Sequence, residues 1–403
     1  MKARRGSLSA LIAAALLSTF ILAAPGASAQ GASLVVQVGA PVFALPAAKG
    51  APVDGMRFYA PAMNVHQGDI VTFTFGGFHT ATLLPANTDA DTWVADNAIG
   101  FGKPYSFSIP DADEGATGVK GNPAVLLPNQ VNCGSAATPC AYDGTGVVNS
   151  GIVDPNDVQG TQPYTFSVVI TAPVGSVITG LCLVHLGMRL QMTVVASSET
   201  ATTQAEIDSF ATTKENHDAR AGHKQHVSLL ASTANQSGDV IDAYAGYDGP
   251  YFALEYMYPS KIKLQKGQQV TWHFDQLAFE DHTVTFPSKK AFNITNGSLF
   301  PPVCDPDGAG TAPDNPSNPD ATTLAEVCPS ITQIEFDQDP RFGPPAGDGK
   351  VTSTKDFESS GVEGANAGVS VPFTLRFTAK TDNKPYTFTC MIHPFMHGKV
   401  VVG

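Results

Sequence analysis

The chain has 403 residues, of which 43% are hydrophobic, and its formal net charge is −13. This length allows two domains of ordinary size, each with its own hydrophobic core. The acidic balance argues against a nucleic-acid-binding protein, because such proteins neutralise phosphates with clustered Lys and Arg. It suits salt-sensitive encounter with a basic partner protein, as well as simple solubility.

The first 29 residues have the organisation of an export signal. Three basic residues precede an apolar run over residues 8–24, and Ala27-Ser-Ala29 is a small-residue cleavage site. The apolar run is too short and too weakly flanked to favour a membrane span. We therefore expect a signal peptide over residues 1–29, cleaved near Ala29, and a periplasmic or secreted mature chain without a transmembrane segment. Its removal would take the net charge to −16.

The first half of the remaining chain alternates short β-like runs with Gly- and Pro-rich turns. Early strands are expected near residues 34–38, 42–45 and 56–59. A further strand in Gly68-Asp-Ile-Val-Thr-Phe-Thr-Phe75 alternates apolar and polar residues and leads to Phe78-His79-Thr-Ala-Thr. A long insertion over residues 86–162, rich in Asp, Asn, Gly and Pro, comes next.

A thiol, an imidazole and a thioether then follow in Cys182-Leu-Val-His185-Leu-Gly-Met188, ahead of another β-like run. Residues 198–226 are expected to form a short helical or flexible linker, since Thr203-Gln-Ala-Glu206 has the pattern of a capping box. The linker would separate a first domain over residues 30–197 from a second over residues 227–403.

The second half repeats the first. Its strand Gly267-Gln-Gln-Val-Thr-Trp-His-Phe274 is followed by Asp281-His282-Thr-Val-Thr, and an insertion over residues 288–371 corresponds to the first one. The chain then ends with Cys390-Met-Ile-His393-Pro-Phe-Met396 and a β-like run. One Cys-x-x-His-x-x-Met pattern is weak evidence. Two copies, each preceded at a similar distance by a His-Thr-x-Thr run, indicate a duplication.

Six cysteines in an exported chain favour disulfides. Two pairs each enclose a polar loop, and these are the expected bridges: Cys133–Cys140 and Cys304–Cys328. Cys182 and Cys390 are then left as free thiols, which is unusual in an oxidising compartment. A bound metal would protect both.

These ligand loops resemble those of the cupredoxins, the blue copper proteins, and the C-terminal loop looks most like that of amicyanin, with plastocyanin as a more distant likeness. The resemblance implies an all-β fold of two tandem cupredoxin-like Greek-key β-sandwiches with long loop insertions, and the strand spacing itself predicts antiparallel sandwiches. It also implies two type 1 copper ions, bound by two sets of ligands: His79, Cys182, His185 and Met188 in the first half, and His282, Cys390, His393 and Met396 in the second.

In this interpretation each Cys supplies a thiolate, the two His complete a trigonal plane, and the Met is a weak axial ligand. Amicyanin-like proteins generally carry Asn after the first His, and here Thr80 and Thr283 stand in its place. A threonine hydroxyl can partly substitute for that amide. Cupredoxins usually pass electrons through the edge of the loop His, so Leu186-Gly187 and Pro394-Phe395 are the expected docking patches.

The expected function is therefore an exported electron carrier that shuttles single electrons between redox partners. Copper storage or delivery is the first alternative. A two-domain copper oxidoreductase of the nitrite reductase or laccase type is a weaker one, because such enzymes need additional copper held by His-x-His pairs or a His directly before the Cys. None of the ten histidines forms a His-x-His pair, and Leu181 and Thr389 precede the cysteines.

Overall fold

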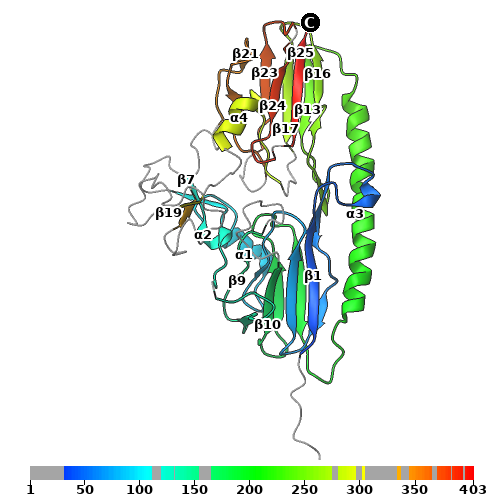
Figure 1. Ribbon diagram of the computed structural model, residues 1–403, viewed down its shortest axis with the longest axis vertical. Helices are drawn as coiled ribbons and strands as arrows, with labels where there is room; N and C mark the ends of the chain where they lie inside the picture. The colour runs from blue at the N-terminus through cyan, green and yellow to red at the C-terminus, as the bar shows by residue number, and fades with distance from the viewer. Residues whose placement is uncertain are drawn as a thin grey trace, which may run out of the picture. The chain divides into compact units, whose positions relative to one another are not determined.

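The structure is a computed structural model in which residues 31–110, 119–130, 132–153, 165–274, 280–295, 302–304, 334–336, 345–364, 370–382, 384–393 and 395–403 are described. Residues Gly31–Gly403 form one compact unit. Strands dominate it (Figure 1), so the prediction of an all-β fold is confirmed. The signal peptide expected at residues 1–29 lies outside the described residues. Within the described ranges, no helix has both the length and the apolar character needed to cross a membrane.

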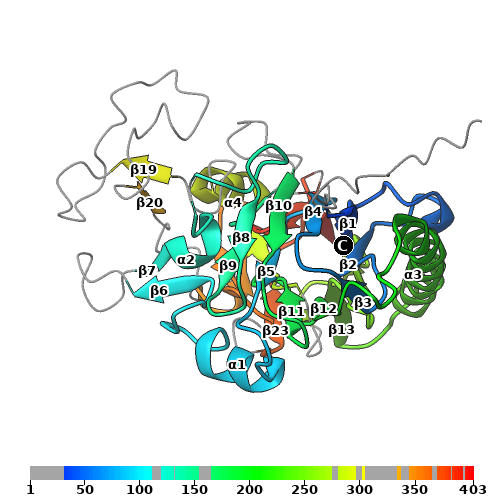
Figure 2. The ribbon, with the colours of Figure 1, turned by 90° about the horizontal axis from the view of Figure 1, so that it is seen from below.

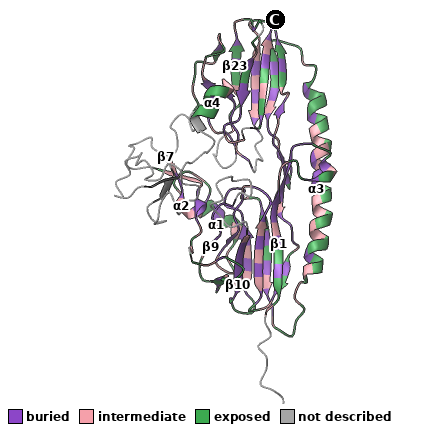
Figure 3. Ribbon diagram, viewed as in Figure 1, coloured by how far each residue is buried: buried purple, intermediate pink, exposed green. Residues whose placement is uncertain are grey.

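The first half forms two sheets that share one hydrophobic core. In the first sheet the strand order is β14 (Phe252–Leu254), β2 (Val53–Phe58), β1 (Ser33–Ala40), β4 (Ile70–Phe75), β10 (Thr165–Ile170) and β8 (Cys140–Tyr142). In the second it is β3 (Met63–Val65), β12 (Arg189–Val194), β11 (Val177–Leu181), β5 (Thr82–Leu83) and β9 (Val148–Asn149). Buried residues alternate with less buried ones along β4, as expected when one face of a strand packs against a second sheet. Figure 3 shows buried and exposed residues along β1 in the same sheet.

The second half forms another pair of sheets around its own core. The first of these has the order β15 (Met257–Tyr258), β13 (Val240–Ala245), β17 (Gln269–Phe274), β23 (Phe373–Phe377) and β21 (Lys350–Val351). The second has the order β16 (Lys261–Leu264), β25 (His397–Val402), β24 (Tyr386–Thr389), β18 (Thr285–Phe286) and β22 (Glu358–Ser359). Trp272 on β17 is fully buried and packs edge-on against Phe286 and Phe388 of the facing sheet.

Apart from β14, which has no counterpart among the described strands of the second pair, the strands of the two pairs of sheets match one to one when read in chain order, which agrees with a duplication. The pairing differs from the expected antiparallel pattern, because β1 runs parallel to β4 and β13 runs parallel to β17. These neighbours are not consecutive strands. The chain passes through β2 and β3 before it returns to β4, so a hairpin does not set their relative direction.

The expected linker is a longer helix than predicted. Helix α3 (Gln204–Thr233) begins with the predicted capping box, in which Thr203 and Glu206 bond reciprocally, but it continues beyond residue 226. It contacts β1, β2, β14, β15 and the short 3-10 helix η1 (Pro46–Ala48), and Figure 2 shows it nearly end-on beside β1 and β2. The Arg57 guanidinium pairs with the buried Asp218 carboxylate at 2.7 Å and holds the helix to β2.

Strand β14 comes after α3 in the chain yet completes the first sheet by pairing with β2. The domain boundaries at residues 197 and 227 therefore stay a prediction, since the sheet pairing continues across them. The strand expected at residues 42–45 is instead a turn that leads into η1, with Phe43 in a left-handed conformation at φ 65°.

Both insertions contain short elements of their own. The first holds α1 (Ala90–Asn97), β6 (Ser108–Pro110), β7 (Val119–Gly121), α2 (Pro123–Leu126) and strands β8 and β9. The predicted Cys133–Cys140 disulfide lies there and is confirmed. The second holds α4 (Ser288–Thr295), β19 (Pro302–Cys304), β20 (Ile334–Phe336) and strands β21 and β22. Of the predicted Cys304–Cys328 bridge, Cys328 lies outside the described residues and nothing is described of the Cys304 side chain.

Candidate metal centres

The first predicted site forms where three segments meet at one end of the first sandwich. His79 lies between β4 and β5, in a bridge to Val153. Cys182 follows β11 directly, and His185 lies in the short turn that leads to β12. The turn is closed by two backbone hydrogen bonds, from Cys182 N to the Met188 carbonyl and from Met188 N to the His185 carbonyl. The side chains thus come from the segment between β4 and β5 and from the turn between β11 and β12.

The donor atoms of this site converge. The Nδ1 atoms of His79 and His185 are 2.8 Å apart, and the Cys182 sulfur lies 3.7 Å from His185 Nδ1. All three side chains are buried, as is Met188. The structure therefore brings the predicted His, Cys and His together.

The second site repeats this arrangement. The Nδ1 atoms of His282 and His393 are 3.2 Å apart, and the Cys390 sulfur is again 3.7 Å from His393 Nδ1. Backbone hydrogen bonds close the turn between Cys390 and Met396, whose side chain is also buried. The four predicted residues of the second half thus occupy positions equivalent to those of the first.

These distances fit a single metal ion in each site. Imidazole nitrogen and thiolate sulfur bind first-row metals at roughly 2.0–2.3 Å, so three such donors around one ion lie roughly 3–4 Å apart. In both groups the ligand atoms, one from each His, Cys and His, lie within 4.8 Å of one another, which leaves room for one ion. A donor set of one thiolate and two imidazoles suits copper in particular.

The threonine that follows each upstream His ties the two ligand segments together. The Thr80 hydroxyl accepts a hydrogen bond from Leu183 N at 2.8 Å, and the Thr283 hydroxyl accepts one from Met391 N at 2.7 Å. Each threonine backbone N–H also donates to the cysteine sulfur of its own site at 3.3 Å. Each threonine thus links the two ligand segments of its site, in keeping with the expectation that its hydroxyl can partly substitute for asparagine.

A glycine with a positive φ packs against each upstream His, and sequence reasoning missed both. A Cβ on Gly39 would lie 1.9 Å from His79 Nε2, and one on Gly246 would lie 2.1 Å from His282 Nε2. Their φ angles are 70° and 77°, a conformation that favours glycine. An alignment of the two repeats at the ends of β1 and β13 would have revealed these two glycines.

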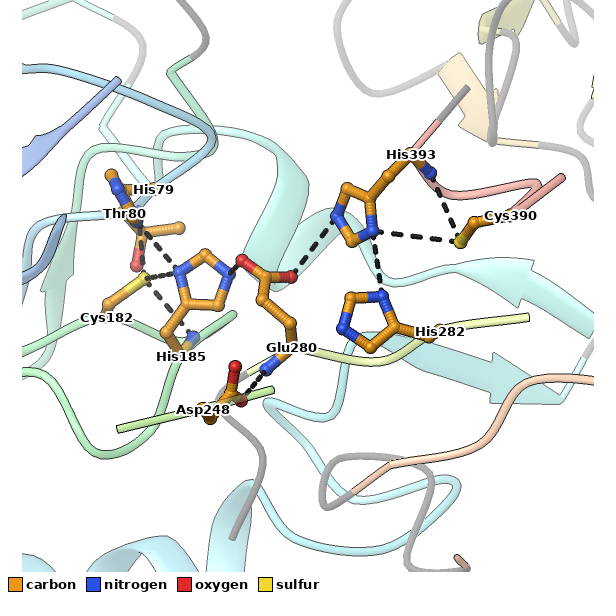
Figure 4. Close-up of polar contacts among 9 residues, drawn as sticks. All are labelled: His79, Thr80, Cys182, His185, Asp248, Glu280, His282, Cys390 and His393. Carbon is orange, nitrogen blue, oxygen red and sulfur yellow. Dashed lines mark hydrogen bonds and ion pairs between the residues drawn. The ribbon is translucent and has the colours of Figure 1, made fainter. Parts of the chain in front are cut away.

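The two sites are linked by a glutamate that the sequence did not point to. Glu280 Oε1 lies 2.8 Å from His185 Nε2, and Glu280 Oε2 lies 3.4 Å from His393 Nε2 (Figure 4). Both distances are those of ion pairs, and His185 Nε2 makes no hydrogen bond to the described residues. The backbone N–H of Glu280 donates to the Asp248 carboxylate at 3.0 Å, and this bond holds the start of the segment that leads from Glu280 to His282.

The electrostatics of both sites favour thiolates. Burial alone would raise the pKa of Cys182, but the imidazoles of its site outweigh burial and hold that pKa well below its ordinary value. The pKa of Cys390 is lowered in the same way by the imidazoles of the second site. The thiolate is the form that binds a metal.

Glu280 and its two histidines stabilise one another's charged forms. Burial opposes the charge on Glu280, but His185 and His393 outweigh it and keep the pKa of this carboxyl well below its usual range. Burial likewise opposes the charge on His185, but the Glu280 carboxylate and the Cys182 thiolate together outweigh it and raise the pKa of the imidazole. Glu280 is therefore an anion next to both sites.

Glu255 is a further acidic residue beside the second site. One of its carboxylate oxygens, one of Glu280 and one ring nitrogen of His393 lie within 4.8 Å of one another. Burial raises the pKa of Glu255 to about 7. These three residues could also hold a metal ion, and the sequence gave no spacing pattern for them.

The predicted docking patches differ in exposure. Phe395 is 47% exposed, and its ring centroid lies 6.0 Å from that of His393 and 6.5 Å from that of Phe43, which is also exposed. Leu186, in the first half, is partly buried against the core. Pro394 lies outside the described residues.

No family model matches the chain, and no curated protein matches it. Similar solved structures include a P52G mutant of amicyanin (15% identity, 42% of this chain and 89% of that one, TM-score 0.18). Another is auracyanin A, a "blue" copper protein from Chloroflexus aurantiacus (16% identity, 41% and 98%, TM-score 0.18). A structure titled multicopper oxidase has 12% identity and covers 92% of this chain and 88% of that one, with a TM-score of 0.19. Such TM-scores are too low to assign a function, so the sites are judged from the chain's own geometry.

Proposed function

We propose that the chain is an exported electron-transfer protein with two type 1 copper sites. One site would use His79, Cys182, His185 and Met188, and the other His282, Cys390, His393 and Met396. The observation that supports this most is the repeated convergence of two Nδ1 atoms and one sulfur in each half of the chain. A chance cluster of polar groups would not recur with the same atoms and nearly the same distances.

Bound copper would supply a one-electron couple between Cu(I) and Cu(II). The protein's part is to hold the donors in one arrangement for both oxidation states. The Thr80 and Thr283 ties, the closed turns and the buried positions of the ligands restrict movement. Little rearrangement is needed when an electron arrives or leaves, which favours rapid transfer.

The redox partners are proposed to be proteins with a basic surface, since the chain's net charge is −13. Phe395, exposed beside the His393 ring, supports an entry point for electrons at the second site. We propose that the mature chain acts in the periplasm or outside the cell.

The decisive experiment measures the copper-to-protein ratio and the visible spectrum of the purified chain and of the Cys182→Ser and Cys390→Ser variants. Two coppers per chain and an intense thiolate-to-copper band, halved by either substitution, are expected. No such band, or a band that neither substitution changes, would contradict the carrier. Copper that is bound without this band and passes readily to a chelator would favour storage or delivery instead.

A copper oxidoreductase is the second candidate, and one observation favours it. Glu255, Glu280 and His393 could hold a third ion next to the second site. The same copper analysis separates the two functions. Two coppers per chain support the carrier, whereas a third copper that is lost in Glu255→Gln would favour the oxidoreductase.

A further inference from the structure

Metal-binding histidines usually donate their second ring N–H to a carboxylate or a carbonyl, which fixes the orientation of the ring. In this chain one carboxylate faces the second nitrogen of two such histidines, one from each site. Glu280 lies between His185 and His393, with one oxygen directed to each ring (Figure 4). It is 7% exposed, so water does not screen these contacts strongly.

The duplication shows that this residue is not part of the repeated motif. The run that contains His282 aligns with the run that contains His79, and this places Gly77 at the position equivalent to Glu280. The first half therefore has no carboxylate of its own at this point. His185 instead reaches the glutamate of the second half.

We propose that Glu280 is a shared positioning residue that couples the two centres, so that the redox state of one changes the reduction potential of the other. This inference rests on the proposed function. An oxidised centre would make the ring of its histidine more positive and draw the carboxylate toward itself. The other histidine is then less stabilised by that carboxylate, and its centre is harder to oxidise. Repulsion between the two oxidised centres acts in the same direction.

The test is a spectroelectrochemical titration of the copper-loaded chain and its Glu280→Gln variant. The parent should show two one-electron steps separated by about tenfold in equilibrium constant, which lies in the lower part of the usual range for coupled sites and equals about 59 mV for one electron. Glutamine is neutral and does not attract both rings as the carboxylate does, so the separation should shrink. An equal separation in parent and variant, with both sites still holding copper, would overturn the proposal.

Glu280→Asp keeps the charge but shortens the side chain by one methylene, so it cannot reach both histidines as before. If Glu280 acts through contact, this variant should also lose the coupling. If it acts only as a nearby charge, the coupling should persist, which would contradict a bridge. Glu358→Gln is the matched control, because Glu358 is equally buried but accepts hydrogen bonds from the Asp348 and Gly349 backbone. It should leave both potentials unchanged.

Nuclear magnetic resonance of the histidine side chains gives a readout that does not depend on electron transfer. In the chain loaded with diamagnetic Cu(I), the Nε2–H protons of His185 and His393 should both exchange slowly with water, and both should change in Glu280→Ala. A response from only one histidine would show that the carboxylate is not shared. Absence of copper or of the thiolate band would instead count against the proposed function, before any coupling is measured.

Discussion

The Cys182 site and the Cys390 site have nearly the same ligand geometry but different surroundings. The sulfur-to-Nδ1 distance is 3.7 Å in both. The side chain of His185, however, is 2% exposed, whereas that of His393 is 13% exposed. The comparison shows that the local motif sets the donor positions, while residues outside the motif decide how open each site is.

If the chain transfers electrons as proposed, this difference gives the two centres different places in the electron path. The Cys390 site lies behind the exposed Phe395 and suits exchange with outside partners. The Cys182 site has the partly buried Leu186 next to its loop His and contacts the second half through Glu280. We therefore expect the Cys390 site to be the outer centre and the Cys182 site the inner one.

The largest expected effect follows from the glycines behind the upstream histidines. In Gly39→Ala the new methyl would overlap the His79 ring, and in Gly246→Ala it would overlap the His282 ring. Each substitution should displace one histidine and reduce the copper content from two ions per chain to one, leaving the other site intact. Elemental analysis together with the intensity of the visible band measures this.

Gly50→Ala is the control for strain alone. Gly50 has a φ of 80°, and a Cβ there would meet no atom within 4 Å. It should cost about 1–2 kcal/mol of stability, the penalty for a left-handed residue, and leave both coppers in place. If Gly39→Ala kept two coppers, the close packing of Gly39 against the His79 ring would not be what holds that histidine in place.

The sequence was sufficient to predict the residues that recur in both halves. His79, Cys182 and His185 are brought together as expected, and so are their counterparts, because each ligand is fixed by a strand next to it in the chain. The ligand roles of all eight residues stay predictions, and Met188 and Met396 are buried.

Features that depend on contacts between the halves could not be predicted. Glu280 gains its role only because His185 and His393 come within reach of one carboxylate. No periodicity or spacing encodes that meeting, since its first-half equivalent is Gly77. The length of α3 was underestimated for a similar reason. Its buried residues pack against strands far away in the sequence, so the helix shows only a thin apolar stripe of its own.

Substitutions of Thr80 and Thr283, whose hydroxyls link the two ligand segments of each site, test whether the two sites are equally rigid. Thr80→Val and Thr283→Val keep the side-chain shape but leave the Leu183 or Met391 N–H without its acceptor. Loss of a buried hydrogen bond of this kind costs about 1–3 kcal/mol of stability. Copper affinity at the affected site should fall by about 10–100-fold, the usual effect of losing a residue that orients metal ligands.

Competition with a copper chelator measures this affinity for each site separately, in the Cys390→Ser or Cys182→Ser background. Thr72→Val is the control, because the Thr72 hydroxyl bonds to Ser167 within the first sheet, away from both sites. It should lower stability and leave copper affinity unchanged. Equal affinities in the parent and in both threonine variants would show that the loop ties do not hold the ligands.

The smallest effect concerns the exposed aromatic at the outer site. Phe395→Ala removes apolar surface beside His393 and replaces none of the predicted ligands, so the visible spectrum should not change. Reduction by cytochrome c, a basic protein, should slow by about fivefold, equivalent to ~1 kcal/mol of lost docking energy. Reduction by the small cation hexaammineruthenium needs no docking surface and should keep its rate.

Leu186→Ala is the matched change at the inner site. If electrons enter only at the Cys390 site, Leu186→Ala should leave the rate of reduction by cytochrome c unchanged. If Leu186→Ala slowed this reduction more than Phe395→Ala, the assignment of inner and outer centres would be reversed.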